Sequence, residues 1–473
     1  MTDQIKQIGG NTLSERGQAA PTRREFIQTS GSAVAGYALT QIVGTGNLLR
    51  AQGPDLINTA RGCIFIMLNG GPSHIDTFDI KQGSWTPADF GVRMIGDVAM
   101  PAGLFPNLVQ HMDRVAIVRS GRSWSAVHAI AQYWIYSSQN FNPAFLRERP
   151  AFPSIMAFEY EGRRGPDDVL PPFVALNGAL FAGVPVGVTV SNGFLSALYA
   201  PFLVTPNPTG VPSLTSPFGQ PRFETFYGLL ETVDAEHRGD NPPMGKPASD
   251  YSDFYKASRR MMYNPAVEET FRYTTEERDR YGNTGFGNAC IVSRNLMTTN
   301  KGTVCAFIQN GGWDNHVGIY TPTAHYRNCT TLDLGLSNLI TDLAAAPGRN
   351  PGTSVLDEVL IVITGDFGRT PASRYGPTGL NPTGGRDHWN LSQSLVFIGG
   401  GVQGGRAIGA TDANGESIVD FGWSENRPIY FEDVGATIYS ALGIDWTKEV
   451  ALPSGRPYQY TRTGFKPVSL LFQ

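Results

Sequence analysis

Histidines and carboxylates gather in four polar segments of this sequence, each of which directly follows an apolar run. The segments are NGGPSHIDTFD (69–79), RSGRSWSAVH (119–128), NGGWDNH (310–316), and GDFGRTP with GGRDHWN (365–390). Five of the seven histidines lie in or just after them, namely His74, His128, His316, His325 and His388. Imidazoles and carboxylates without paired thiolates are the donors of Zn, Mn, Fe or Mg sites. The pattern therefore favours a metal centre.

The strongest metal candidates are in the last two segments. One residue separates Asp314 from His316, so both side chains can reach the same ion, and Asp366 and His388 add a further oxygen and nitrogen. An isolated Asp-x-His pair is more often a hydrogen-bonded turn. Its recurrence beside other polar segments at strand ends favours metal binding.

Anion-binding groups occur in the same segments. Arg122, Arg369 and Arg386 carry guanidinium groups, which suit bidentate binding of phosphate or sulfate. Asn69 begins an Asn-Gly-Gly turn whose backbone N–H groups can approach an oxyanion closely. Each arginine taken alone is more often a salt-bridge partner.

A serine-rich segment supplies candidates for a nucleophile. Ser120, Ser123 and Ser125 precede an expected helix, and a hydroxyl beside a cation can attack an ester. The alternative for each serine is simple capping of that helix. His128 ends the same segment and is the second catalytic candidate.

The apolar runs before these segments predict the strands that position them. The runs are 62–71, 114–120, 302–309, 359–366 and 394–401. Helical spacing of apolar residues follows at 126–138, 324–347 and 430–445. Alternating buried strands and helices predict an α/β protein with a mostly parallel sheet, in which ligands bind at the carboxyl ends of the strands.

The composition limits the classes of function. The 473 residues carry a net charge of -4, which excludes a basic surface for nucleic acid. The region 140–300 is rich in Pro, Gly and aromatic residues and is predicted to be a cap inserted into the core. The four cysteines form no CxxC pair, so buried thiols are favoured over a disulfide or a zinc site.

The N-terminus has the pattern of an export signal. Arg23 and Arg24 precede a weakly apolar stretch at 32–43, and Ala51 is a plausible cleavage point. An amphipathic helix is the alternative. A twin-arginine signal peptide over 1–51 predicts that the export machinery is a partner and that the mature protein, without a transmembrane segment, is periplasmic or extracellular.

Two familiar motifs are excluded by their context. The Asp-Phe-Gly at 366–368 is not accompanied by the other kinase motifs. The glycine-rich GGGVQGGR (399–406) lacks the following helix and acidic residue of a dinucleotide site.

Several short motifs in order resemble one known family. They are RREF, NGGPSHIDTFDIK, WDNH, GDFGRTP, GRDHW and ALGID, between residues 23 and 445. Together they resemble the domain of unknown function 1501 (DUF1501) family, twin-arginine-exported bacterial proteins related to the sulfatases and alkaline phosphatases. The resemblance implies an alkaline phosphatase-like α/β/α sandwich over 52–473. It also implies metal ligands at Asp314, His316, Asp366 and His388.

The sequence departs from the wider superfamily at three places. Asn69 stands where a metal-binding Asp is usual, so Asp76 or His74 would have to replace that ligand, and Phe367 replaces a metal-binding His. No C-x-P-x-R sulfatase signature is present, and Ser125 is the serine chosen as nucleophile.

These departures favour one divalent ion, with Zn, Mn, Fe, Mg and Ca left open. The expected function is hydrolysis of small phosphate or sulfate esters. The alternative is a binding or structural protein of the cell envelope that has lost catalysis.

Overall fold

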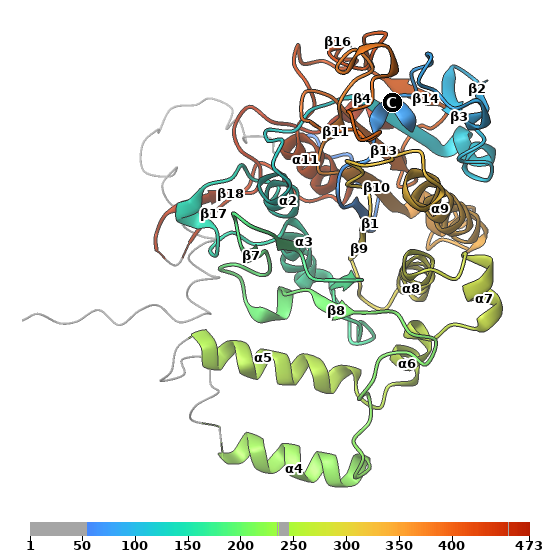
Figure 1. Cartoon of the computed structure of the whole chain (residues 1–473). Helices are drawn as coiled ribbons and strands as arrows, with labels where there is room; N and C mark the ends of the chain where they lie inside the picture. Colours follow the sequence, from blue (N-terminus) through green and yellow to red (C-terminus); the bar gives the residue numbers. More distant parts are fainter. Residues whose placement is uncertain (1–53, 234, 236–245, 453) are drawn as a thin grey trace, which may run out of the picture. The chain divides into compact units, whose positions relative to one another are not determined.

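The computed structural model describes residues 54–233, 235, 246–452 and 454–473 (Figure 1). The predicted signal peptide at 1–51 lies outside them. The chain divides into two compact units, one of residues 1–52 and 226–252 and the other of residues 53–225 and 253–473. Within the first unit, the structure describes residue 235 and those parts of helices α4 (Gln220–Val233) and α5 (Lys246–Met261) that fall in 226–252. The second unit contains the central sheet and every candidate site residue.

The central sheet has eight strands in the order β14-β4-β13-β10-β1-β9-β5-β8. Their bounds are β1 Gly62–Leu68, β4 Val115–Gly121, β5 Phe173–Leu176, β8 Phe202–Val204, β9 Cys305–Asn310, β10 Val359–Gly365, β13 Gln393–Ile398 and β14 Arg406–Ile408. All pairings are parallel except those of β13, which is antiparallel to β10 and β4. The predicted mostly parallel sheet is confirmed.

Helices cover both faces of this sheet because its strands are apolar on both faces. In β1, Ile64 and Ile66 contact one hydrophobic cluster, while Phe65 and Met67 contact the other. The first cluster includes α8 (Gly285–Thr299) and α9 (Arg327–Ala345). The second includes α2 (His128–Ser137), α3 (Phe152–Tyr160) and α11 (Phe431–Ala441). The result is the predicted α/β/α sandwich (Figure 1).

Shorter elements complete the unit. The helices are α6 Pro265–Phe271, α7 Thr275–Arg280 and α10 Val355–Glu358. The two-stranded ribbons are β2 Val92–Ile95 with β3 Val98–Pro101, β6 Phe181–Ala182 with β7 Val188–Thr189, β11 Gly368–Arg369 with β12 His388–Trp389, β15 Ala410–Thr411 with β16 Ile418–Asp420, and β17 Glu449–Ala451 with β18 Pro457–Gln459. The helices that the structure describes are each too short or too polar to span a bilayer. All four cysteines are buried free thiols.

The region 140–300, predicted as a cap inserted into the core, also contributes elements to the core itself. It supplies strands β5 and β8 to one edge of the sheet, and its helices α3 and α8 lie on opposite faces. The two strands have only four and three residues and lie between Pro-rich turns. Such short runs carry too little periodicity to be recognised as strands.

Helix α11 begins with a buried carboxyl group that should make the stability depend on pH. Oε2 of Glu432 accepts a hydrogen bond from Trp124 Nε1 at 3.3 Å, and Oε1 has no hydrogen-bond partner among the described residues. Burial raises the pKa of this carboxyl group from 4.5 to about 7. The folded protein therefore keeps a proton that the unfolded chain releases.

We expect Glu432 to lower the free energy of unfolding as pH rises from about 4.5 to 7. The loss amounts to about 3 kcal/mol and stays constant at higher pH. In Glu432→Gln this contribution is absent, so the variant gains stability relative to the wild type between pH 5 and pH 8. Urea denaturation of both proteins at the two pH values measures the change. An equal difference in stability at both pH values would contradict the assignment.

Candidate metal centre

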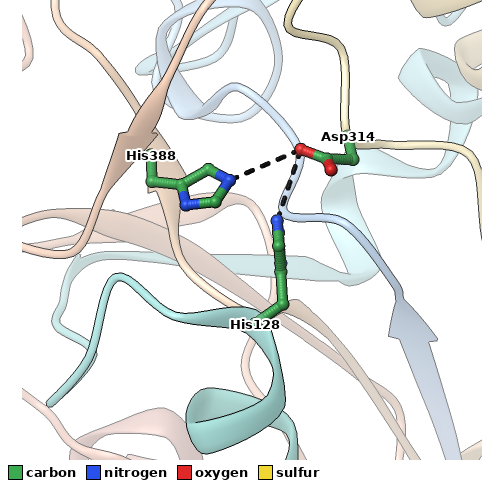
Figure 2. A group of neighbouring side chains, drawn as sticks. All are labelled: His128, Asp314 and His388. Atoms are coloured by element: carbon green, nitrogen blue, oxygen red, sulfur yellow. Dashed lines mark ion pairs between the residues drawn. The ribbon is translucent and has the colours of Figure 1, made fainter. Parts of the chain in front are cut away.

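The candidate ligands meet at the edge of the sheet where β1, β4, β9 and β10 have their carboxyl ends. His128 is the first residue of α2, and Asp314 lies in the loop after β9. His388 lies on β12, which pairs with β11 just after β10. This ribbon returns the chain to the same edge, where the antiparallel strand β13 begins. In Figure 2 the side chains of His128, Asp314 and His388 point toward one another.

Three imidazole nitrogens surround one carboxylate oxygen. Oδ1 of Asp314 lies 3.0 Å from Nε2 of His316, 3.3 Å from Nε2 of His128 and 3.6 Å from Nε2 of His388. The Nε2 atoms of His316 and His388 are 2.9 Å apart. Ligands of a tetrahedral zinc ion at about 2.0–2.1 Å lie about 3.4 Å from one another. His128, Asp314 and His388 are therefore spaced as ligands of one small cation, and His316 lies beside them in contact with Asp314 and His388.

Each imidazole is held on its other side by an oxygen acceptor. The Nδ1 acceptors are Asp387 Oδ1 for His316 at 2.7 Å, the Ala126 carbonyl for His388 at 2.7 Å, and Asp366 Oδ2 for His128. A carboxylate or carbonyl can only accept, so Nδ1 carries the proton and Nε2 presents its lone pair to the centre. Histidines that bind metals through Nε2 are oriented in this way.

The centre requires positive charge. Lone pairs on two nitrogens 2.9 Å apart, next to a carboxylate, repel one another unless a proton or a metal cation neutralises them. Burial lowers the pKa of His128, but the carboxylates of Asp314 and Asp366 outweigh it and raise that pKa to about 9, so a second proton on Nε2 can also supply this charge. Burial opposes ionisation of Asp314, yet the neighbouring His128, His388 and Arg369 side chains hold its pKa well below the usual range.

The donor set fits a divalent transition metal. The two imidazoles and one carboxylate of His128, His388 and Asp314, with the His316 imidazole beside them, suit Zn, Mn or Fe, whereas Mg and Ca prefer shells of oxygen. Nε2 of His128 and Oδ1 of Asp366 are buried and have no hydrogen-bond partner among the described residues. A bound cation would account for such unpaired polar atoms. The side chain of Asp314 is 47% exposed, so the cluster is open to solvent and to a ligand.

Asp366 should set the metal affinity by orienting His128. Its buried Oδ2 contacts Nδ1 of His128 and accepts hydrogen bonds from Gly70 N at 3.2 Å and from Gln132 Nε2 at 3.3 Å. Asp366→Asn places a neutral amide where the imidazole needs an acceptor. We expect an affinity loss of about 10–100-fold. Competition with a chelating dye measures it, and an unchanged affinity would contradict this role.

Asp76 and Arg386, predicted as a metal ligand and an anion-binding residue, bind each other instead. Nε of Arg386 donates to Oδ2 of Asp76 at 2.6 Å, and both side chains are 0% exposed. Ser73 and Tyr320 donate their hydroxyls to the same carboxylate at 2.6 and 2.8 Å. The structure does not bring this pair to the cluster, because each group is used by the other.

His74 also stays outside the cluster. Its Nε2 lies 2.7 Å from the Gly415 carbonyl and 3.1 Å from Ser392 Oγ, and its Nδ1 lies 3.4 Å from the backbone nitrogen of Arg369. Burial lowers the pKa of the imidazole, which favours its neutral form. Both ring nitrogens are therefore occupied by other groups.

Arg369 lies beneath the centre and holds Asp314. Its guanidinium donates to Oδ1 of Asp314 and to the carbonyls of Gly70 and Gly71. Gly70 has φ +107°, and a Cβ there would lie 2.4 Å from the Asp314 backbone nitrogen. The glycine thus lets the two loops approach. With 1% of its side chain exposed, Arg369 acts as a partner of Asp314 rather than as an open anion site.

The remaining predicted residues lie in the surrounding loops. Nδ2 of Asn69 donates a hydrogen bond to Gln309 Oε1, and Oδ1 of Asn69 accepts one from the Tyr136 hydroxyl at 3.3 Å. Ser125 Oγ accepts from the backbone nitrogen of Val127 at 3.0 Å, just before α2.

Arg122 differs from the two buried arginines. It is half-buried and forms no side-chain hydrogen bond or ion pair with the described residues. Its guanidinium is therefore available to an anion.

Sequence reasoning missed two supporting residues. Asp387 holds His316, and Gln132 donates to Asp366. Gln132 lies four residues after His128 on α2 and so shares its helix face, which is a usable signal.

Phe367 is fully buried, with its ring centroid 4.6 Å from that of His128 and 4.7 Å from that of His388. Its phenyl ring packs against the two imidazoles and offers no atom that could bind a metal ion.

The fold and this cluster define an α/β protein with a histidine- and carboxylate-lined site at the carboxyl edge of a mostly parallel sheet. A family model with the description "Protein of unknown function (DUF1501)" matches residues 60–471, which is most of the chain. The chain belongs to that family. No curated protein matches it.

Several solved structures are distantly similar to the chain. The lipoteichoic acid synthase LtaP from Listeria monocytogenes is 11% identical, with 88% of this chain and 76% of that chain covered and a TM-score of 0.35. A protein in the alkaline phosphatase superfamily from Vibrio parahaemolyticus is 11% identical, with 85% of this chain and 74% of that chain covered and a TM-score of 0.34. A phosphonate monoester hydrolase from Silicibacter pomeroyi is 11% identical, with 87% of this chain and 76% of that chain covered and a TM-score of 0.39. At such low TM-scores the assignment of function depends on the site itself.

Proposed function

We propose that the protein is a metal-dependent hydrolase of small phosphate or sulfate esters. The observation that carries the proposal is the convergence of three Nε2 lone pairs on Asp314 Oδ1, each imidazole being fixed through Nδ1. A structural ion needs a closed shell, whereas Asp314 is 47% exposed. An open, preorganised centre is what a catalytic ion requires.

The residues around the centre have separable roles. When bound, a divalent ion would supply Lewis acidity that polarises an ester oxygen. Asp366 and Asp387 keep the Nδ1 protons of His128 and His316 in place, so that both Nε2 atoms stay free. Arg122 would hold the anionic group of the substrate, since Arg369 is saturated by its own partners.

Ser125 is the proposed nucleophile. It precedes Ala126, whose carbonyl holds His388, and it shares its loop with His128. Its Oγ already accepts a hydrogen bond from Val127 N, which leaves the hydroxyl proton free for transfer. Attack by this oxygen on the phosphorus or sulfur would break the bond to the alcohol of the substrate, which takes up a proton as it leaves. The phospho- or sulfoserine so formed would then be hydrolysed by water to free serine and phosphate or sulfate.

A substrate panel tests the proposal. Purified chain loaded with Zn, Mn or Fe is assayed with phosphomonoesters, phosphodiesters, sulfate esters and phosphonates. We expect turnover of at least one class, and a loss of about 100-fold or more in kcat for Ser125→Ala with its metal content unchanged. Absence of turnover with fully loaded protein would refute the hydrolase. Full activity of Ser125→Ala would refute the nucleophile alone.

Phe367 and Asn69 favour a second candidate, an envelope protein that binds anions without catalysis. Phe367 supplies no ligand beside His128 and His388, and Asn69 is engaged by Gln309. The same substrate panel distinguishes the hydrolase from the binding protein. A loaded protein that binds phosphate or sulfate but turns over no ester supports the binding protein.

Export through the twin-arginine machinery to the periplasm or the cell exterior is part of the proposal. The motif at Arg23 and Arg24 supports it. Cell fractionation of a variant with both arginines replaced by lysine tests it. We expect the variant to remain inside the cell, and unchanged export would contradict the signal assignment.

A further inference from the structure

A cavity of about 240 Å³ lies at the amino edge of the sheet, opposite to the edge that carries the metal centre. Four arginines line it, namely Arg61, Arg163, Arg164 and Arg349. Arg61 directly precedes β1, and the lining residues Thr303 and Val304 directly precede β9, which places the cavity at the start of the parallel strands. Asp168 is the one acidic residue in its lining. The cavity wall thus carries an excess of positive charge.

Two of the arginines build this wall. Arg61 donates to Glu358 Oε2 at 2.9 Å and to Asn300 Oδ1 at 3.0 Å. Arg164 donates to the Gly302 carbonyl at 2.7 Å. Both are also paired with carboxylates outside the lining, Arg61 with Glu358 and Arg164 with Glu161 at 3.7 Å. These two guanidinium groups therefore fix the wall, and the unpaired positive charge comes from the other two arginines. Burial lowers the pKa of Arg61, and the nearby charge of Arg349 lowers it further.

The other two arginines are open to a ligand. Arg163 and Arg349 are exposed, and no carboxylate of the described residues forms an ion pair with either. Arg163 donates to the Gly443 carbonyl at 3.1 Å and lies 4.5 Å from the ring centroid of Tyr160. Arg349 donates to Asn300 Oδ1. Neutral acceptors orient both groups, so neither charge is neutralised.

We infer that this cavity binds a tetrahedral oxyanion, namely the phosphate or sulfate group of a small molecule. Guanidinium groups match the oxygen spacing of such anions. A cavity of about 240 Å³ is smaller than the range of about 300–1,000 Å³ usual for drug-sized ligands, which limits the ligand to an anion with few further atoms. The site is independent of the metal centre and of the proposed hydrolysis.

Calorimetric titration tests the site without interference from the metal centre. The full chain carrying Asp314→Asn is titrated with inorganic phosphate, with sulfate and with acetate at constant ionic strength. We expect one phosphate or sulfate per chain. The added pair Arg163→Gln and Arg349→Gln should weaken binding about 10-fold or more, as loss of charge-assisted hydrogen bonds predicts. Arg93→Gln, an exposed arginine on β2, serves as the matched control and should change nothing.

Three results would overturn the inference. They are no binding of phosphate or sulfate, equal affinity in the double variant, and acetate binding as tight as phosphate. Circular dichroism shows whether the double variant is folded. If it is not, Arg349→Gln alone, a change in an exposed loop, should still weaken binding, and unchanged affinity in that variant would count against the site.

Discussion

Asp314→Ala is expected to release the metal ion and to abolish ester hydrolysis. Oδ1 of Asp314 is the one carboxylate oxygen to which all three Nε2 atoms of His128, His316 and His388 are directed. Without it, the three imidazoles keep their orientation but lose the negative charge that attracts a cation. We expect the metal content to fall from about one ion per chain to near zero, and the affinity to fall by about 100-fold or more. Elemental analysis of the purified protein measures the content.

Two further variants separate this effect from damage to the fold. Asp113→Ala removes a carboxylate that is 72% exposed and should keep both metal and activity. Asp314→Asn keeps the size of the side chain beside buried Arg369, so loss of metal in this variant reports the lost charge. Retention of one ion per chain in both Asp314 variants would contradict the proposed ligand set.

Arg386→Met is expected to destabilise the protein strongly without touching the cluster. Arg386 and Asp76 are both 0% exposed, and the charge of Arg386 keeps the pKa of Asp76 low although burial acts to raise it. The variant leaves an unpaired buried carboxylate. Removing one partner of such a pair costs about 3–5 kcal/mol. Urea denaturation followed by circular dichroism measures the free energy of unfolding.

Two controls test whether the loss of stability in Arg386→Met comes from the buried ion pair: its dependence on pH, and the loss caused by breaking an ion pair at the surface. In Arg386→Met the pKa of Asp76 rises, so protonation relieves the defect and the loss should be smaller in acid than at pH 7. Lys448→Met breaks a pair with Glu159 at 2.7 Å in which the lysine is 41% exposed, and it should cost less than about 1 kcal/mol. A loss in Arg386→Met no larger than in Lys448→Met would contradict a structural ion pair.

The core of the fold could be predicted from the sequence because apolar runs end abruptly at polar turns. The run ending at Gly365 became β10, and the runs at 62–71 and 302–309 contain β1 and β9. Parallel strands share one carboxyl edge, so the residues after these runs, Asp314 and Asp366, had to lie near one another. That rule accounts for the candidate residues that the structure brings together.

Partners of buried charges could not be predicted in the same way. Asp76 and Arg386 are 310 positions apart, and their pairing depends on the path of the loop after β11. Local sequence carries no information on that path. The direction of β13 could not be predicted from the sequence either, because an apolar strand has the same pattern in either orientation. It is this direction that brings His388 to the site.

X-ray absorption at the metal edge of the loaded chain tests the central claim most directly. His128, His388 and Asp314 predict a first shell of nitrogen and oxygen at about 2.0–2.1 Å for zinc, with the outer-shell scattering of at least two imidazole rings. The same spectrum from Asp366→Asn should show weaker order of one ring, since His128 loses its acceptor. A shell of oxygen alone, sulfur in the shell, or no stoichiometric metal would contradict the account.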